Sequence, residues 1–110
     1  MSYKIIPTKK FGKELKRLVK KYPSLKNEYT SLIRDLEKNP TNGVSLGNNC
    51  YKIRLAISSK GSGKSGGARV ITHIIISEET VYLISIFDKS ECENISDKEI
   101  QERLKSEIFK

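Results

Sequence analysis

The chain has 110 residues and a formal net charge of +8, and hydrophobic residues make up 36% of it. A chain of this length is expected to form one domain over residues 1–110, with a modest core. No apolar run approaches the roughly 20 residues of a membrane span, and no signal peptide is evident. Two cysteines fit reduced thiols in the cytoplasm, and a single histidine without a paired-cysteine motif argues against a metal or other cofactor.

Positive charge is concentrated in the first two thirds of the chain. Residues 1–76 carry a net charge of +12, whereas residues 77–110 carry a net charge of −4. No carboxylate occurs between Glu37 and Glu78, although that interval contains six lysines and arginines. Such a stretch suits a polyanion, for which nucleic acid is the commonest candidate, and an incidentally basic, solvated surface is the alternative.

The first 40 residues predict a strand and a pair of helices. Residues 3–8 form a short strand-like segment that Pro7 ends. Apolar residues then recur with helical spacing over residues 11–22, and the opposite face of this helix is cationic. Pro23 ends the helix and suits the first turn of a second one, with an apolar stripe over residues 25–36. Two successive stripes predict a helical hairpin packed on another apolar surface.

Three later segments predict strands. In "CYKIRLAI" (residues 50–57) apolar residues alternate with Lys52, Arg54 and Ala56, while "ARVITHIII" (68–76) and "VYLISIF" (81–87) are rich in β-branched residues. Short connections favour an antiparallel meander, and "SDKE" begins a solvated C-terminal helix over residues 96–109. The expected fold class is α+β: an N-terminal strand and helical hairpin packed on an antiparallel β-sheet meander, with a short C-terminal helix.

The stretch "GSGKS" is similar to the core of a nucleotide-binding P-loop, but its spacing and surroundings exclude that motif. A P-loop requires a glycine five positions before Gly63, where this chain has Ser58. The segment that follows predicts a strand, whereas a P-loop leads into a helix whose N-terminus holds the phosphates. Binding of ATP is therefore not expected.

Basic side chains converge on one part of the predicted sheet instead. Antiparallel pairing brings the end of strand 50–57 near the start of strand 68–76, and the glycines between them allow close approach to a phosphate. The predicted phosphate site contains Lys52, Arg54, Lys60, Lys64, Arg69 and Lys89. Sets of basic residues of this kind position phosphates rather than read bases.

The segments "YKIRLAISSKGSGKSGGARVI" and "YLISIFDKSE" resemble the RelE/HigB/ParE superfamily of toxins from bacterial type II toxin–antitoxin modules. The Lys-x-Arg strand and the Gly-Lys-rich loop ending in Gly-Gly-Ala-Arg indicate the HigB-like RelE branch. The resemblance covers most of the chain. The family fold that it implies is a compact sheet backed by two N-terminal helices, in agreement with the elements above.

The resemblance implies a ribosome-dependent, metal-independent endoribonuclease that cuts mRNA by attack of a ribose 2′-OH on the adjacent phosphate. Arg69 matches the family's arginine that stabilises the transition state. Arg54, Lys60 and Lys64 match basic positions around the scissile phosphate, and Lys89 matches a lysine after the final strand. These five residues are the expected catalytic set.

Phe87 stands where many relatives have a tyrosine. A phenyl ring can stack on an RNA base but cannot donate a proton, which leaves the general base open. Lys60 or Lys64 is favoured, because neighbouring cations lower the pKa of a lysine. A nearby carboxylate, Asp88 or Glu91, is expected either to hold a lysine in place or to react.

Other RNA contacts are expected outside this set. Lys13, Lys16 and Lys20 on the first helix, together with Lys52 on the sheet, would contact RNA phosphates. The only histidine, His73, is expected to be a hydrogen-bonded strand residue rather than a catalytic one.

Two other functions stay open at this stage. ParE-like members of the superfamily poison DNA gyrase, and retention of the basic set favours the ribonuclease over them. A non-catalytic, basic nucleic-acid-binding domain would need only the charge, whereas catalysis also needs a titrating group. The resemblance further implies a cognate antitoxin, expected to be a DNA-binding repressor, as a partner beside mRNA and the ribosome.

Overall fold

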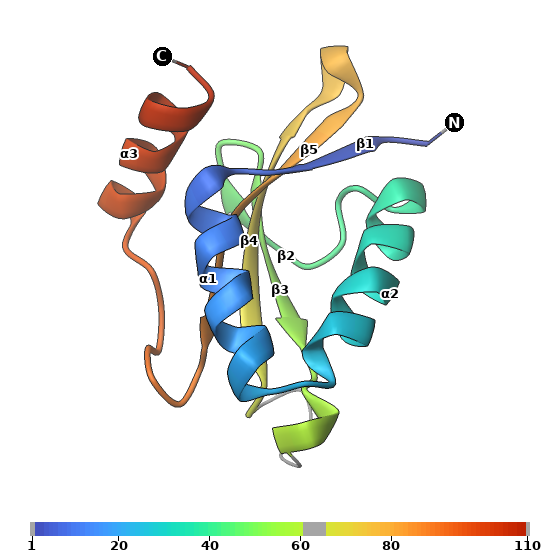
Figure 1. Cartoon of the computed structure of the whole chain (residues 1–110). Helices are drawn as coiled ribbons and strands as arrows, with labels where there is room; N and C mark the ends of the chain where they lie inside the picture. The colour runs from blue at the N-terminus through green and yellow to red at the C-terminus, as the bar shows by residue number, and fades with distance from the viewer. Residues whose placement is uncertain (1, 61–65, 110) are drawn as a thin grey trace.

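The computed structural model describes residues 2–60 and 66–109 and confirms the predicted α+β class (Figure 1). In chain order the elements are β1 (Lys4–Pro7), α1 (Lys9–Lys21), α2 (Leu25–Lys38), β2 (Val44–Gly47), β3 (Cys50–Leu55), the 3-10 turn η1 (Ser58–Lys60), β4 (Ala68–Ile75), the 3-10 turn η2 (Ile76–Glu78), β5 (Thr80–Asp88) and α3 (Asp97–Glu107). No helix in this part of the chain is long and apolar enough to cross a membrane. The helical hairpin and the three strands after it lie where the sequence predicts them.

The sheet is mixed rather than purely antiparallel. Its strand order is β1-β5-β4-β3-β2, with β1 parallel to β5 and the other neighbours antiparallel. The predicted N-terminal strand therefore belongs to the sheet itself, as an edge strand, because the helical hairpin carries the chain away before β5 returns beside it. Parallel neighbours need such a crossover connection.

The strand β2 was not predicted. Its four residues are all exposed, so they lack the apolar alternation that identified the other strands. The hairpin from β2 to β3 pairs Gly47 with Cys50 across Asn48 and Asn49, whose φ angles are +53° and +60°. A two-residue turn with both φ angles positive matches the twist of the flanking strands, and asparagine tolerates that conformation.

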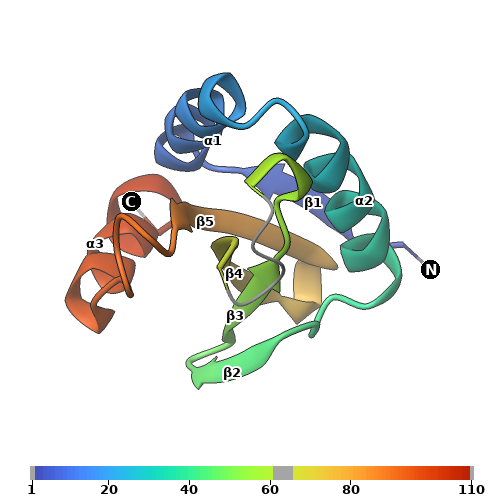
Figure 2. The ribbon, with the colours of Figure 1, turned by 90° about the horizontal axis from the view of Figure 1, so that it is seen from below.

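Helices cover both faces of the sheet. The hairpin of α1 and α2 buries one face in the larger core, which includes Phe11, Leu18 and Leu36. On the other face Ile100 and Leu104 of α3 are buried with apolar residues of β3, β4 and β5. Figure 2 shows α3 across β5 from α2. The C-terminal helix is therefore docked on the sheet, and the prediction of a solvated helix was wrong.

Polar contacts also fasten α3 to α1. Each oxygen of the Glu14 carboxylate accepts a hydrogen bond of 2.9 Å from the Arg103 guanidinium. Arg103 donates to the carbonyl of Ile84, and Glu14 accepts from the N–H of Ile86. These two backbone groups lie close to the point where β5 has one extra residue relative to β4, and past Leu83, the last β5 residue that pairs with β1, so the ion pair supplies partners where β1 has ended. Hydrogen bonding to Glu14 raises the pKa of Arg103.

The N-terminus of α3 begins as predicted. The Ser96 hydroxyl caps the helix by accepting the N–H of Glu99 at 3.1 Å. Glu99 does not complete a reciprocal capping box, because its carboxylate accepts from Arg103 at 2.8 Å. Near the other end, Glu107 accepts the N–H of Lys9 at 2.6 Å, which places a carboxylate at the N-terminus of α1.

Candidate active site

Two arginines face each other across β3 and β4. Arg54 and Arg69 are direct partners in the antiparallel register. Ile74 N–H donates to Asn49 O at 2.9 Å, so residues 49 and 74 are a hydrogen-bonded pair of this ladder. Because such pairs alternate, Arg54 and Arg69 form a pair without mutual backbone hydrogen bonds. The Cα atoms of such pairs are only about 4.5 Å apart, and their side chains are on the same face. The predicted convergence of Arg54 and Arg69 is confirmed.

The electrostatics of this pair favour an anion. Arg54 is exposed, whereas Arg69 is 4% exposed. Burial, and then the charge of Arg54, lower the pKa of Arg69. One Arg69 N–H donates to the carbonyl of Ala68 at 3.1 Å. Like charges directly opposite each other in a sheet destabilise it, and a phosphate between or above them would relieve that repulsion.

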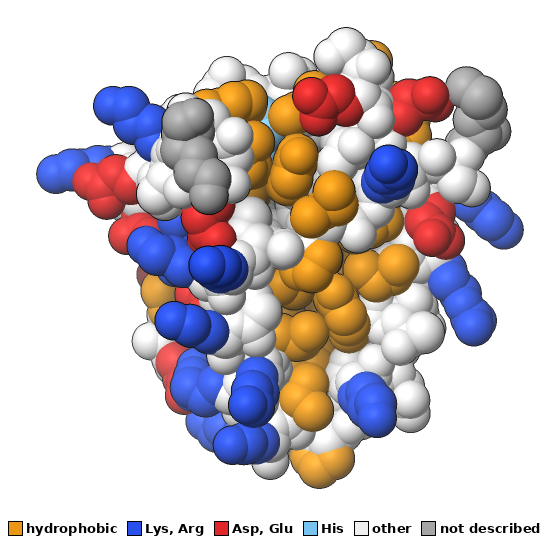
Figure 3. All heavy atoms as spheres, turned by 45° about the horizontal axis from the view of Figure 1, so that its top comes forward, with side chains coloured by type: hydrophobic (Ala, Val, Ile, Leu, Met, Phe, Trp, Pro, Cys, Tyr) orange, Lys and Arg blue, Asp and Glu red, His pale blue; other side chains and the backbone are white. Residues whose placement is uncertain are grey.

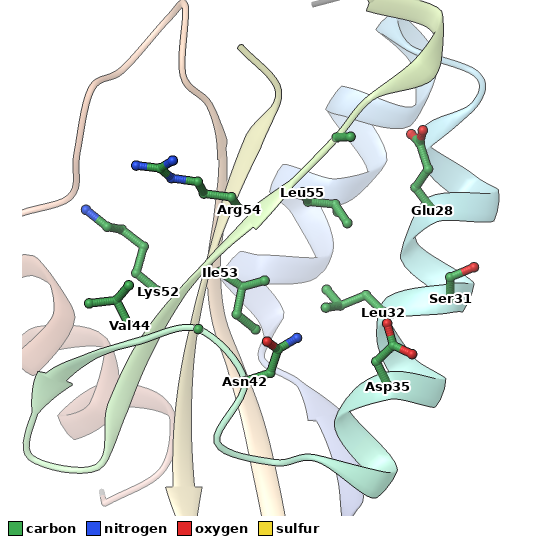
Figure 4. Close-up of a pocket in the computed structure, with 12 residues that line it drawn as sticks. Glu28, Ser31, Leu32, Asp35, Asn42, Val44, Lys52, Ile53, Arg54 and Leu55 are labelled. Carbon is green, nitrogen blue, oxygen red and sulfur yellow. The ribbon is translucent and has the colours of Figure 1, made fainter. Parts of the chain in front are cut away.

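Lys52 extends the basic surface by one step along β3. It lies two residues before Arg54 and therefore on the same face. Figure 4 shows Lys52 and Arg54 pointing away from α2, while Ile53 and Leu55 point toward it. Within the described part of the chain, Lys52 and Arg54 make no side-chain hydrogen bond or ion pair. One lysine and one arginine side chain are therefore available to a ligand.

A groove of about 780 Å³ lies between α2 and β3, and Figure 4 shows the residues that line it. Leu32, Ile53 and Leu55 form its apolar wall, and Glu28 and Asp35 lie on the α2 side. The groove lies on the side of the sheet that the helical hairpin covers. Lys52 and Arg54 point to the other side and therefore lie at the edge of the groove.

Lys60 lies elsewhere. Its ammonium group forms an ion pair with Asp88 and donates to the carbonyl of Gly66 at 2.7 Å and the hydroxyl of Ser90 at 3.1 Å. An ammonium group has three N–H donors, so these three acceptors use all of them. Asp88 is paired in register with Ala68, next to Arg69, and so lies on the opposite face from the arginines. The expected role of Lys60 as general base or phosphate ligand finds no support in this placement.

Asp88 is the carboxylate that holds a lysine in place, as one of the predicted alternatives has it. It is 0% exposed and accepts the Tyr22 hydroxyl at 2.7 Å. Burial raises the pKa of Asp88, but hydrogen bonds from Lys60, Tyr22 and Ser90 outweigh burial and hold it well below the usual range. Sequence reasoning assigned Tyr22 only to the apolar stripe of α1. The position of this tyrosine at the end of the helix was the available signal of a polar partner.

Phe87 continues the row from Arg69, its register partner, to β5. The ring is 8% exposed and is buried in the smaller core with Ile84, Ile100 and Leu104. In this structure the predicted stacking surface of Phe87 is therefore covered by apolar residues. Phe87 is therefore an apolar neighbour of Arg69 at the site.

His73 is a buried strand residue. Its Nδ1 lies 3.4 Å from the Cys50 sulfur, and its ring meets Phe109 edge to face at 5.6 Å between centroids. Burial lowers the pKa of His73 and raises that of Cys50 to about 11. The histidine is four residues along β4 from Arg69, and these contacts match the non-catalytic role predicted for it.

The remaining predicted residues are at the surface or outside the described residues. Lys13, Lys16 and Lys20 on α1 are exposed, as is Lys89 after β5, and Lys64 falls in the undescribed segment 61–65. In the view of Figure 3, lysines and arginines gather along one side of the molecule, beside a band of hydrophobic side chains. Two further α1 cations are engaged, since Arg17 and Lys21 form ion pairs with Glu91 at 2.7 and 3.1 Å.

No cluster of three or more histidine, cysteine, aspartate or glutamate side chains that could hold a metal ion occurs in residues 2–60 and 66–109. The two cysteines are free thiols, with Cys50 buried and Cys92 exposed.

Comparison with known proteins gives a family match over nearly the whole chain. Residues 4–107 match the family described as "RelE toxin of RelE / RelB toxin-antitoxin system".

Solved structures show the same fold. An arginine-to-alanine double mutant of the E. coli toxin RelE in the free state matches with a TM-score of 0.63 and 19% identity, over 96% of this chain and 98% of that one. A chain of the intact E. coli RelBE toxin–antitoxin complex matches with a TM-score of 0.60 and 20% identity, over 79% of this chain and 96% of that one. A metal-bound toxin from Helicobacter pylori matches with a TM-score of 0.52 and 23% identity, over 84% and 99%.

Proposed function

The chain belongs to the RelE toxin family, and we propose that it is the toxin of a type II toxin–antitoxin module. Its activity in this proposal is metal-independent, ribosome-dependent cleavage of mRNA, which stops translation in the cytoplasm. The observation that carries the proposal is the direct apposition of Arg54 and Arg69, with Lys52 beside them. This arrangement brings two like charges together and offers them to a phosphate.

The reaction follows from what such a site can stabilise. The ribose 2′-oxygen forms a bond to the adjacent phosphorus and loses its proton, and the bond from phosphorus to the 5′-oxygen breaks. The leaving oxygen takes up a proton, which gives a 2′,3′-cyclic phosphate and a 5′-hydroxyl. Two guanidinium groups stabilise the extra negative charge of the pentavalent state between these ends.

Lys52 takes the place of Lys60 as the candidate for proton transfer. Lys60 donates to three protein acceptors, while the Lys52 side chain makes no hydrogen bond within the described residues. Lys52 also shares a face with Arg54, so a phosphate held by the arginine would bring its 2′-OH near the lysine. Exposed Lys13, Lys16 and Lys20 would add phosphate contacts that strengthen binding without sequence readout.

The partners follow from the family. The E. coli RelBE structure is a complex of toxin and antitoxin, and we expect this chain to be held silent by a cognate antitoxin that is a DNA-binding repressor. Inhibition of gyrase, the alternative from the wider superfamily, is not favoured by the match to RelE toxins. A non-catalytic basic domain would need only the charge of the paired arginines, and the match to RelE toxins does not favour it either.

The test is induced expression in a bacterium of the wild type, Arg69→Ala and Arg34→Ala, with transcript 5′-ends mapped within minutes. Arg34 is an exposed arginine of α2 and serves as the matched control. We expect growth arrest and new in-frame mRNA cleavages in the wild type and Arg34→Ala, and neither in Arg69→Ala at equal protein level. Arrest without cleavage would indicate the gyrase mechanism, and absence of arrest would leave only a basic binding domain.

A further inference from the structure

A buried carboxylate at the end of β5 accepts hydrogen bonds from three parts of the chain. Asp88 accepts the Tyr22 hydroxyl at the end of α1, the Lys60 ammonium of η1, and both the N–H and the hydroxyl of Ser90, at 3.0 and 2.8 Å. Lys60 continues the network to the carbonyl of Gly66. The reaction proposed above uses none of these groups.

The η1 turn is held from a second side as well. Glu28 of α2 accepts both the N–H and the hydroxyl of Ser58 at 2.6 Å, and the Ser24 hydroxyl accepts the N–H of Ser59 at 2.9 Å. The backbone before Lys60 is therefore anchored to α2, independently of Asp88. As a result, the Lys60 side chain links two fixed points, the start of α2 and the end of β5.

The network reaches Arg69 through the three residues before it. Lys60 fixes the carbonyl of Gly66, and the carbonyl of Gly67 accepts the N–H of Lys89 at 3.1 Å. Gly67 lies so close to β3 that a Cβ would collide with the carbonyl of Leu55. Residues 66 and 67, the entry of β4, are thus bound by Lys60 and Lys89 and packed against β3. The position of Arg69 opposite Arg54 follows from where this entry is held.

We propose that Lys60 and Asp88 form a positioning pair, which fixes the start of β4 so that the Arg69 guanidinium meets the scissile phosphate beside Arg54. This inference rests on the proposed ribonuclease function and deepens it. The pair acts from the opposite face of the sheet and touches no substrate. Lys60 is a structural cation, and its charge is used inside the protein.

The proposal differs in a measurable way from a catalytic role for Lys60. A general base must release and take up a proton, so replacement by arginine would abolish it and change the pH dependence of the rate. A positioning cation needs only its charge and its donors. Arginine supplies both and should therefore rescue function.

The experiment compares Lys60→Met, Lys60→Arg, Tyr22→Phe and the control Lys38→Met in single-turnover cleavage of mRNA on programmed ribosomes. Lys38 is exposed at the far end of α2. We expect Lys60→Met to lower the maximal rate by more than about 10-fold with half-saturation within about threefold of wild type, since a small misplacement costs rate rather than affinity. Lys60→Arg should keep most of the rate and the wild-type pH profile, and Tyr22→Phe should fall between.

A second readout does not depend on activity. The Nε–Hε NMR signal of Arg69, assigned by its loss in Arg69→Lys, should shift in Lys60→Met and return toward its wild-type position in Lys60→Arg. If the wild type fails to cleave mRNA, the ribonuclease proposal fails, and this signal still decides whether Lys60 positions Arg69.

Three results would overturn the positioning pair. The first is a folded Lys60→Met protein with wild-type rate and an unmoved Arg69 signal. The second is Lys60→Arg as slow as Lys60→Met with an altered pH profile, which would make Lys60 a catalytic base. The third applies if Lys60→Met does not fold, and it is a rate for Lys60→Arg well below that of Lys38→Met.

Discussion

At the end of the sheet where β3 finishes and β4 begins, the two faces carry charge differently. On the face toward the helical hairpin, Lys60 is neutralised by Asp88 and every N–H of its ammonium group has an acceptor in the protein. On the face toward α3, Arg54 and Arg69 oppose each other. Residues 68 and 69 are neighbours in β4, so one step along the strand separates an ion pair from a pair of like charges.

In the function that we propose, this difference separates structural charge from functional charge. A cation that stabilises the fold is placed with a carboxylate and hydrogen-bond acceptors, as Lys60 and Arg103 are. Arg54 and Arg69, the cations that the proposal assigns to a phosphate, are instead placed opposite each other. Composition alone could not divide these residues, because all of them count equally toward the net charge.

The largest expected effect tests the compensated face. Asp88→Ala should lower the free energy of unfolding by about 3 kcal/mol, because it leaves the Lys60 charge without its partner in a largely buried site. Urea unfolding at pH 7 measures this, with Asp97→Ala, at an exposed position of α3, as the control. A loss below about 1 kcal/mol, the value typical of surface pairs, would remove the distinction between the two faces.

The pH dependence of the same pair is fixed in sign. The native pKa of Asp88 is lower than that of an unfolded aspartate, about 3.9. Its stabilisation is therefore fully present above about pH 4 and is lost as the pH falls further. Asp88→Asn should be less stable than wild type at pH 7 and should lose less on acidification to pH 2.5. Equal acid losses in the two proteins would contradict this assignment.

The link between α3 and α1 should have the next largest effect. Arg103→Met removes a half-buried guanidinium that satisfies Glu14 and the carbonyl of Ile84, and we expect a loss of about 2 kcal/mol. Hydrogen exchange should show faster exchange in α3 than in α2. Uniformly faster exchange would instead mean that α3 does not open separately.

His73 gives a smaller effect in another pH range. Burial lowers its native pKa, so its contribution is present above the unfolded value of about 6.5 and is lost as the pH falls below it. At pH 5 this loss is at most about 2 kcal/mol, the limit reached if the folded protein takes up no proton. His73→Gln should show a smaller loss between pH 7 and pH 5, measured by urea unfolding.

The smallest effect is expected on the face toward α3, and with opposite sign. Arg54→Met should raise the free energy of unfolding by a few tenths of a kcal/mol at low salt, since it removes a like-charge pair. A short RNA oligonucleotide should raise the melting temperature of the wild type more than that of Arg54→Met. Destabilisation by Arg54→Met would show that the arginine stabilises the fold.

The sequence predicted the elements whose signals are local. Helical spacing identified α1 and α2, alternation identified β3, and the Ser96 cap identified the start of α3. The opposition of Arg54 and Arg69 also followed, because antiparallel pairing of adjacent strands fixes it within one or two residues. These features need little knowledge of the rest of the chain.

The features that were not predicted depend on distant contacts. The parallel pairing of β1 with β5 joins residues about 75 positions apart, and no local pattern specifies it. The docking of α3 depends on Ile100 and Leu104 meeting the far face of the sheet. The sequence did not predict which carboxylate pairs with Lys60 for the same reason, since the path of the chain after β3 decides which face of the sheet the Lys60 side chain reaches. Only β2 had a usable local signal, the pair Asn48 and Asn49.

The pairing of β1 with β5 also determines when the fold can form in the cell. β1 is the first strand to be synthesised, yet its only neighbour in the sheet is the last strand. At about 5–20 residues per second, the nascent chain waits several seconds between the two. Asp88 and the entry of β4 that it anchors are likewise incomplete until then. A polypeptide released before β5 lacks the strand that joins β1 to the rest of the sheet, so the complete fold forms only after β5 has been synthesised.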